Sequence, residues 1–100
     1  GILVRAKLGE PVQAIADGEV VYSDWLRGYG WIIIVEHADQ WFSVYGHNQT
    51  LERTIGDRVR KGEVISTVGD SGGQNKPALY FELRKQAEPK NSNRWCENGG

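Results

Sequence analysis

Short runs of apolar and β-branched residues, separated by turn residues, recur along this chain. Residues 31–35 are apolar without a break, which indicates a strand buried on both faces or lining a groove with one of them. Residues 41–47, 63–68 and 78–84 also have strand character, and no segment keeps the helical spacing of apolar residues. The pattern predicts an all-β domain, mostly antiparallel, built as a flattened barrel or sandwich of short strands.

The segment 78–84 has the clearest two-sided pattern. Side chains along a strand point alternately to opposite faces of a sheet. One face is apolar and is expected in the core with other apolar strand residues: Leu79, Phe81, Leu83, Val20, Ile33, Val44 and Val68. The other face, which can border solvent or a groove, carries Ala78, Tyr80, Glu82 and Arg84. Counting by twos along 41–47 puts Ser43, Tyr45 and His47 on one face.

Turn residues separate the expected strands. The pair Asp17 and Gly18 predicts a hairpin in which residues 12–16 pair with residues 19–23. The Gly-Tyr-Gly sequence at 28–30 predicts a second tight connection, because glycine permits a positive φ. Strands would therefore follow one another as antiparallel neighbours along the chain.

The length predicts one domain over residues 1–100. The apolar, β-branched start suggests a core that begins inside or just before a strand and is therefore truncated at its N-terminus. The polar run after Arg84 has no periodicity, so we expect an irregular tail over about 86–100. The single cysteine, Cys96, can form neither an internal disulfide nor a metal site with a second cysteine.

The charges nearly balance, with 12 Lys and Arg against 13 Asp and Glu and a net charge of −1. Bulk charge therefore gives no reason to expect nucleic acid or an anionic membrane surface as a partner. The longest apolar run, 31–35, is too short to span a bilayer, so we expect no membrane insertion. We expect a monomer whose partners are recognised by local patches.

Short motifs follow one another over residues 1–85: Gly1-Ile2, Gly9-x-Pro-Val-x-Ala, Gly18-x-Val, Gly28-Tyr-Gly, Ile34-Val-Glu-His37, Tyr45-Gly-His47, Gly56-Asp-x-Val-x-x-Gly62, Val68-Gly-x-Ser-Gly72 and Leu79-x-Phe-Glu82. In order and spacing this series resembles the LytM-like (M23) zinc endopeptidases of bacterial cell walls. The resemblance implies a LytM-like core. Enzymes of that family hold zinc with the His and Asp of a His-x-x-x-Asp motif and the second His of a His-x-His pair. The first His of the pair and a His of a Tyr-x-His motif assist the attacking water.

Carried over to this chain, the resemblance leaves the zinc site incomplete. Leu3 stands at the Asp ligand, and the His ligand would fall before Gly1. Tyr80 stands at the third ligand and Ala78 at one catalytic His, so only His47 matches. Leucine and alanine offer no metal-binding atom, and a phenol with a pKa near ~10 is a poor zinc ligand. We therefore expect no metal, no other cofactor and no catalytic residue.

A closer set of motifs resembles the degenerate LytM factors of EnvC type: Ala14-Ile-Ala-Asp-Gly18, Asp24-Trp25-Leu26-x-Gly-Tyr-Gly30, Tyr45-Gly-x-Asn-Gln49, Ser71-Gly-Gly-Gln74 and Leu79-Tyr-Phe-Glu-x-Arg84. That resemblance implies a noncatalytic periplasmic protein of Gram-negative cell division that activates N-acetylmuramoyl-L-alanine amidases. The partner would bind in the degenerate groove, and Tyr and Arg are frequent hot-spot residues at interfaces. The groove residues expected are Leu3, Tyr29, Ile32, Tyr45, His47, Tyr80 and Arg84.

Three alternatives stay open at this point. The first is a noncatalytic peptidoglycan-binding module, with Asn48, Gln49 and Gln74 as polar contacts, and the second is a zinc metallopeptidase completed by residues upstream of Gly1. The repeated Gly-Glu-Val turns also occur in biotinyl and lipoyl carrier domains, but no lysine here lies at a hairpin tip between apolar partners. The indoles are expected in the core or covering the sheet, not stacking on a ligand: Trp25, Trp31 and Trp41.

Overall fold

The computed structural model describes residues 1–86, which form an almost entirely antiparallel β-structure with one short 3-10 turn. The fold class predicted from the sequence is confirmed. The strands are β1 (Ile2–Arg5), β2 (Pro11–Gln13), β3 (Gly18–Leu26), β4 (Gly30–Glu36), β5 (Trp41–Leu51), β6 (Arg58–Val59), β7 (Val64–Val68) and β8 (Ala78–Lys85), with the turn at Ala38–Gln40. Within the described part no helix has the length and hydropathy needed to cross a bilayer. The expected tail and Cys96 lie outside the described residues, apart from Gln86.

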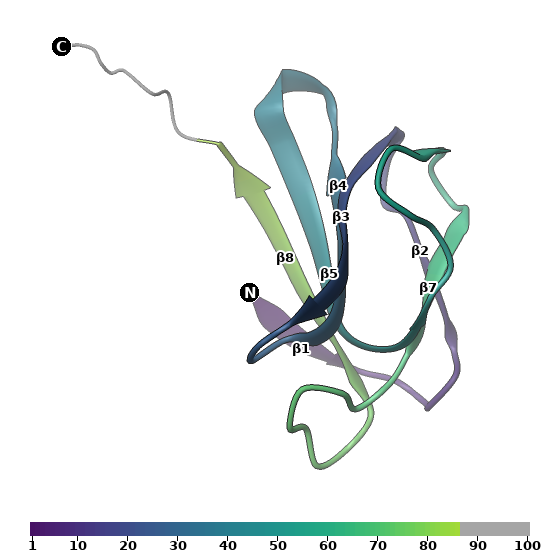
Figure 1. The fold of residues 1–100 in the computed structure, drawn as a ribbon, viewed down its shortest axis with the longest axis vertical. Coiled ribbons are helices and arrows are strands. Elements are labelled where there is room, and N and C mark those ends of the chain that lie inside the picture. The colour runs from purple at the N-terminus through teal and green to yellow at the C-terminus, as the bar shows by residue number, and fades with distance from the viewer. Residues whose placement is uncertain (87–100) are drawn as a thin grey trace, which may run out of the picture.

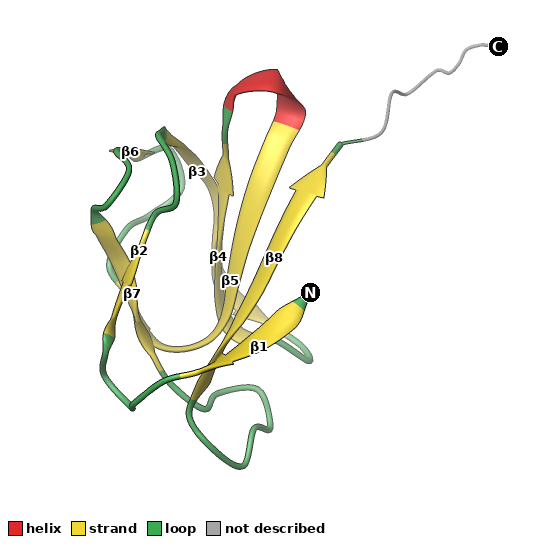
Figure 2. Ribbon diagram, turned by 180° about the vertical axis from the view of Figure 1, so that it is seen from behind, coloured by secondary structure: helices red, strands yellow, loops and turns green. Residues whose placement is uncertain are grey.

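The strands form two layers, which Figures 1 and 2 show from opposite sides. The larger layer has the order β1-β8-β5-β4-β3-β6, and the smaller is the antiparallel pair of β2 and β7. Strand β5 is the longest, with 11 residues. It pairs with β4 and β8 along most of its length, and its end from Asn48 onward pairs with β7. One strand therefore joins the two layers.

The core lies between these layers. It is a cluster of buried side chains drawn from β2, β3, β4, β5, β6 and β7: Val12, Ala14, Val20, Ile33, Val35, Tyr45, Val59, Ile65 and Val68. The predicted core residues Val20, Ile33 and Val68 are confirmed, and Leu79 and Phe81 of β8 pack against the cluster, partly buried.

One core prediction was wrong, and one correctly predicted buried residue packs on the other side of the large layer. Leu83 lies on the core side of β8 but is half exposed, because it borders an open cavity of about 600 Å³ with Ile15 and Trp41. The burial of an apolar face depends on the layer above it, and no described strand covers this end of β8. Val44 is buried, but on the opposite side of the sheet, where it pairs with Ile34 and Glu82.

The hairpin predicted at Asp17 and Gly18 does not form. Strand β2 pairs with β7, while β3 pairs with β4 and β6. Gly18 is required by a close approach, since a side chain there would collide with the carbonyl oxygen of Glu36. The Asp17 carboxylate accepts a hydrogen bond from the backbone N–H of Lys61 at 2.8 Å. The two residues thus carry the chain from one layer to the other. The second predicted connection, at 28–30, does join β3 to β4, with positive φ at both glycines.

The contrast between Phe81 and Leu83 gives a stability test. Phe81→Ala should lower the free energy of unfolding by about 3 kcal/mol, because it empties space beside Tyr45, whose ring centroid lies 5.6 Å away. Leu83→Ala, on the same face of the same strand, should cost about 1 kcal/mol or less, because that side chain is half exposed. Urea unfolding followed by circular dichroism measures both. Equal losses would show that the second layer also covers Leu83 in solution.

Candidate functional site

The surface of the large layer that faces away from the small one is organised by β8. Across this strand, three side chains lie opposite residues of β5: Tyr80 opposite Gly46, Glu82 opposite Val44, and Arg84 opposite Phe42. On its other side Tyr80 pairs with Leu3 of the edge strand β1. We call the surface formed by Leu3, Tyr29, His47, Tyr80, Glu82 and Arg84 the Tyr80 face.

Tyr80 is the centre of this face. Its ring packs edge-on against Tyr29, with centroids 5.2 Å apart, and against His47, at 6.1 Å. Gly1 lies so close that any side chain there would collide with the phenol ring. Three segments that are distant in sequence therefore hold one aromatic ring in place, and the ring remains partly exposed.

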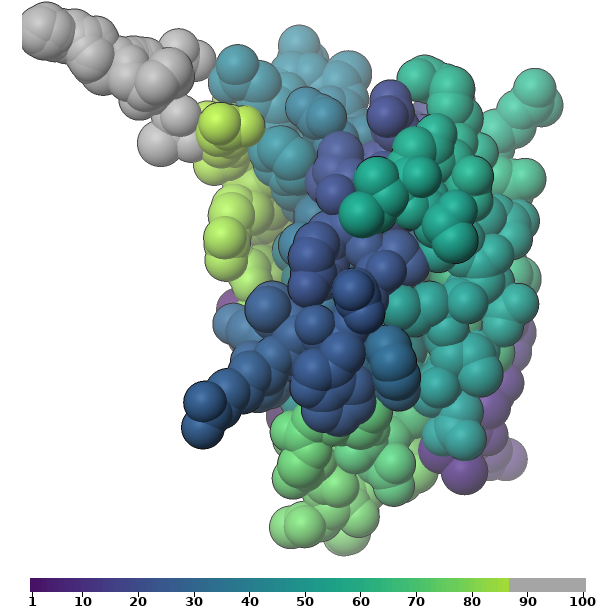
Figure 3. All heavy atoms as spheres, in the orientation of Figure 1, coloured from purple at the N-terminus to yellow at the C-terminus, as the bar shows by residue number. Residues whose placement is uncertain are grey.

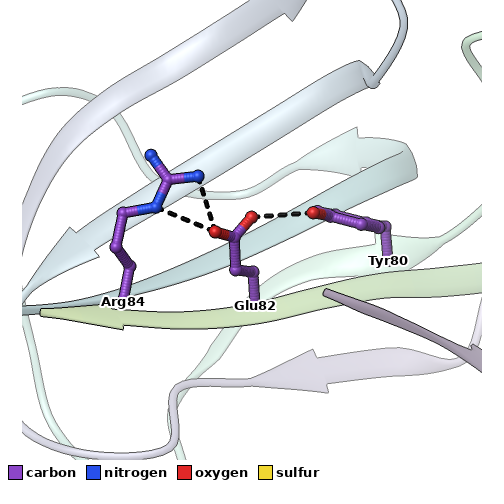
Figure 4. Close-up of polar contacts among 3 residues, drawn as sticks. All are labelled: Tyr80, Glu82 and Arg84. Carbon is purple, nitrogen blue, oxygen red and sulfur yellow. Dashed lines mark hydrogen bonds and ion pairs between the residues drawn. The ribbon is translucent and has the colours of Figure 1, made fainter.

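A chain of hydrogen bonds runs from Tyr80 along the strand (Figure 4). The Tyr80 hydroxyl donates to Oε1 of Glu82 at 2.7 Å. The guanidinium of Arg84 donates to Oε2 of the same carboxylate from Nε, at 2.8 Å, and from Nη2. Residues i and i+2 share a face of a strand, so the alternation of side chains along β8 places these three residues side by side. Glu82 therefore fixes Tyr80 and Arg84, the two residues of β8 that were expected to bind a partner.

The charge states of Tyr80, Glu82 and Arg84 follow from the hydrogen bonds among them. The hydrogen bond to the Glu82 carboxylate, assisted by desolvation, raises the pKa of Tyr80 to about 12. The hydrogen bonds from Tyr80 and then Arg84 lower the pKa of Glu82 below its ordinary value. At neutral pH the face thus presents a neutral phenol and a carboxylate paired with a guanidinium. The side chain of Arg84 is 63% exposed and that of Glu82 only 18%, so the guanidinium is the accessible partner of the pair.

An apolar hollow of about 510 Å³ adjoins Arg84. It is lined by residues of β3, β4 and β5 on the same side of the sheet: Val21, Ile34, Phe42 and Val44. Sequence reasoning missed these residues and the role of Glu82. The pairing of β5 with β8 could have found them, since residues 42, 44 and 46 lie directly opposite 84, 82 and 80. That register is not visible in either strand alone.

The residues that the resemblance places at zinc-site positions, Leu3, Ala78 and Tyr80, lie in two pairs of β1 and β8 residues, with the pair of Val4 and Leu79 between them. Leu3 is exposed and lies opposite Tyr80. Ala78 is buried and lies opposite Arg5. Among residues 1–86 there is no group of three or more His, Cys, Asp or Glu side chains that could hold a metal ion.

Three residues expected in the groove are buried: Ile32, Tyr45 and His47. Tyr45 is 1% exposed and lies in the core, where its hydroxyl donates to Ser43 at 2.7 Å. It shares its side of β5 with Ser43, as the count by twos predicted, but that side faces the core, so the assignment of Tyr45 to the groove was wrong. Ile32 is 2% exposed, so no partner can contact it directly.

His47 does not share a face with Tyr45, contrary to the sequence count. Its φ of 61° lies in the left-handed region, which interrupts the alternation of β5 and turns the ring toward Tyr80. The ring N–H at Nδ1 donates to the carbonyl of Ser71 at 2.6 Å, and the backbone N–H donates to that of Tyr29 at 2.7 Å. His47 is buried and supports the two tyrosines from behind.

The raised pKa of Tyr80 predicts a spectroscopic titration. A phenol whose pKa is higher in the folded state stabilises the fold below the ordinary tyrosine pKa of ~10, and that contribution is lost as the pH rises through about 12. Glu82→Gln removes the carboxylate charge, so Tyr80 should titrate nearer ~10 in that variant. Phenolate absorbance measures this, and Tyr80→Phe identifies which transition belongs to Tyr80. An unchanged titration in Glu82→Gln would contradict the hydrogen-bonded chain.

Comparisons with known proteins were made for the whole chain. The model of peptidase family M23 matches residues 1–92. The chain is 46% identical over 95 residues to the murein hydrolase activator EnvC of Escherichia coli, covering 95% of this chain and 23% of that protein. It is 38% identical over 96 residues to the murein hydrolase activator NlpD of the same organism, covering 95% of this chain and 25% of that one. The chain thus spans about a quarter of the length of these relatives.

A solved structure gives the same fold. The catalytic domain of the prophage-encoded M23 protein EnpA from Enterococcus faecalis superposes with a TM-score of 0.81 at 33% identity. The match covers 87% of this chain and 68% of that one. EnvC and NlpD are named as activators, whereas this structural neighbour is named as a catalytic domain.

Proposed function

The chain belongs to peptidase family M23, and we propose that within this family it is a noncatalytic activator of N-acetylmuramoyl-L-alanine amidases, which it binds through the Tyr80 face. The proposal assigns it to the periplasm of a Gram-negative bacterium, where the amidase cleaves septal peptidoglycan during cell division. One observation carries it. The hydroxyl of Tyr80, the residue that the resemblance puts at the family's third zinc ligand, donates a hydrogen bond to Glu82.

The chemistry of the Tyr80 face supports a noncatalytic role. To bind zinc, the phenol of Tyr80 would have to lose its proton, and its pKa of about 12 makes that loss more costly than for an ordinary tyrosine. Leu3, directly across from it, has no donor atom for a metal. Ala78 cannot accept a proton from an attacking water.

The same face has the features of a protein-binding surface. Tyr and Arg are favoured at interface hot spots, which are strongest when their side chains are held in one geometry before binding. Tyr80 and Arg84 are both tied to Glu82, and the apolar hollow beside Arg84 offers a pocket for a side chain of the partner. Two relatives with the same domain, EnvC and NlpD, are named murein hydrolase activators. Amidases are the hydrolases that we assign to this chain.

Replacing the side chains that protrude from this face should impair activation. Tyr80→Ala and Arg84→Ala should each weaken amidase binding by about 1–3 kcal/mol, because each removes a preorganised interface residue. Arg58→Ala is the matched control, since Arg58 is also an exposed arginine paired with a glutamate, Glu19, but on β6. The measurement is dye release from labelled sacculi by a purified amidase, with a melting curve for each variant.

Full activation by a folded double variant, Tyr80→Ala with Arg84→Ala, would place the amidase-binding surface elsewhere on the domain. A loss of activation in Arg58→Ala as large as that in Arg84→Ala would also contradict the proposal, because it would show a general response to lost surface charge.

The proposal also predicts that the fold is independent of zinc. The core is a continuous apolar cluster, so a chelator should leave the melting temperature unchanged. Elemental analysis after dialysis should find far less than one zinc per chain. About one tightly held zinc per chain, or unfolding caused by the chelator alone, would overturn the noncatalytic assignment.

A further inference from the structure

Two tryptophans on the β3–β4 hairpin are exposed, although the sequence predicted them in the core or covering the sheet. Trp25 is 47% exposed and Trp31 is 39% exposed. They are cross-strand partners, and regular alternation places Trp31 on the side of β4 that also carries Ile33, a core residue. The pair therefore lies on the side of the sheet opposite Tyr80, beyond the edge of the core. Figure 3 shows the hairpin, in blue, projecting from the molecule.

The two indoles form a defined platform. Their ring centroids are 5.2 Å apart and their planes meet at 82°, so the edge of one ring meets the face of the other. Such an arrangement leaves part of both aromatic surfaces open to solvent, in agreement with the exposed fractions. Exposed apolar side chains that gather in one place, unlike those scattered singly, mark interaction sites.

Four side chains hold the backbone of this pair in place. The N–H of Trp25 donates to the Asp24 carboxylate at 2.7 Å, and the Tyr22 hydroxyl donates to the Trp25 carbonyl at 3.1 Å. The N–H of Trp31 donates to the Ser71 hydroxyl at 3.1 Å, and its carbonyl accepts a hydrogen bond at 2.9 Å from the amide of Asn48, which is itself fully buried. Exposed side chains with such a braced backbone are preorganised for contact, which reduces the entropy lost on binding.

The charge around the platform narrows the class of ligand. Between Tyr22 and Trp31 the charged side chains are Asp24 and Arg27, one of each sign, so this part of the hairpin has no excess positive charge to attract an anionic lipid surface. A neutral ligand with apolar C–H faces fits an open indole pair better. Pyranose rings have such faces, and their hydroxyl and acetamido groups remain hydrated beside them.

From the rigid, neutral indole pair, we propose that Trp25 and Trp31 form a binding site for the glycan strand of peptidoglycan, with N-acetylated hexosamines as the ligand. The inference rests on the proposed function, because that function brings the domain to peptidoglycan. The same hairpin carries Tyr29, which contacts Tyr80 on the opposite side of the sheet. An amidase on the Tyr80 face and a glycan on the indole pair would be held at two sides of one hairpin, and tethering raises their effective concentration.

The probe is a chitin oligosaccharide, an unbranched chain of N-acetylglucosamine, titrated while tryptophan fluorescence and calorimetric heat are recorded. Trp25→Ala and Trp31→Ala should each weaken binding by about tenfold or more. The matched control is Trp41→Ala, since Trp41 is 38% exposed and sits on β5 seven residues from Asn48, the partner of Trp31. That separation is about 23 Å along a strand. The control should bind as the unaltered domain does, and melting curves establish that each variant is folded.

Co-sedimentation with intact sacculi extends the test to the natural polymer, and Trp25→Ala should reduce it while Tyr80→Ala should not. Undiminished oligosaccharide binding by folded Trp25→Ala and Trp31→Ala variants would overturn the inference. So would binding to vesicles of anionic phospholipid in place of the oligosaccharide, or a loss confined to Trp41→Ala.

The two experiments separate an error in the proposed function from an error in the glycan site. If the proposed function is wrong, the unaltered domain would fail to stimulate amidase-dependent dye release while still binding the oligosaccharide through Trp25 and Trp31. The reverse pattern, activation sensitive to Tyr80→Ala with no oligosaccharide binding, would overturn the glycan site alone.

Discussion

The alternation of side chains along β8 and β5 is the constraint on which both the core and the Tyr80 face depend. Phe81 packs toward Tyr45 in the core, while its neighbours Tyr80 and Glu82 point to the outer surface. A shift of β8 by one residue would exchange these two sets. Because the core fixes the register, it also fixes which side chains of β8 lie on the Tyr80 face.

A single carboxylate holds the side chains at the centre of the Tyr80 face in place. Glu82 accepts hydrogen bonds from Tyr80 and from Arg84, which leaves a rigid aromatic ring and an exposed guanidinium side by side. The phenol of Tyr80 and the guanidinium of Arg84 are thus held by one carboxylate, which is the arrangement on which the proposed binding role rests.

The sequence predicted the parts of this picture that depend on local alternation. The two faces of β8 were read correctly for Leu79, Phe81, Tyr80 and Arg84. The count failed for His47, because a left-handed residue interrupts β5. It failed for Leu83 and the exposed tryptophans, because burial depends on how far the second layer extends. The false hairpin at Gly18 arose because a close backbone contact and a tight turn both require glycine.

The most direct test of the account is a map of the amidase-binding surface by nuclear magnetic resonance. The isotope-labelled domain is titrated with an unlabelled amidase, and the backbone amide shifts are followed residue by residue. The account predicts that the largest changes cluster at Leu3, Tyr29, Tyr80, Glu82 and Arg84, with β2 and β7 little affected. Changes confined to β2 and β7, or a spectrum that an active amidase leaves unaltered, would contradict it.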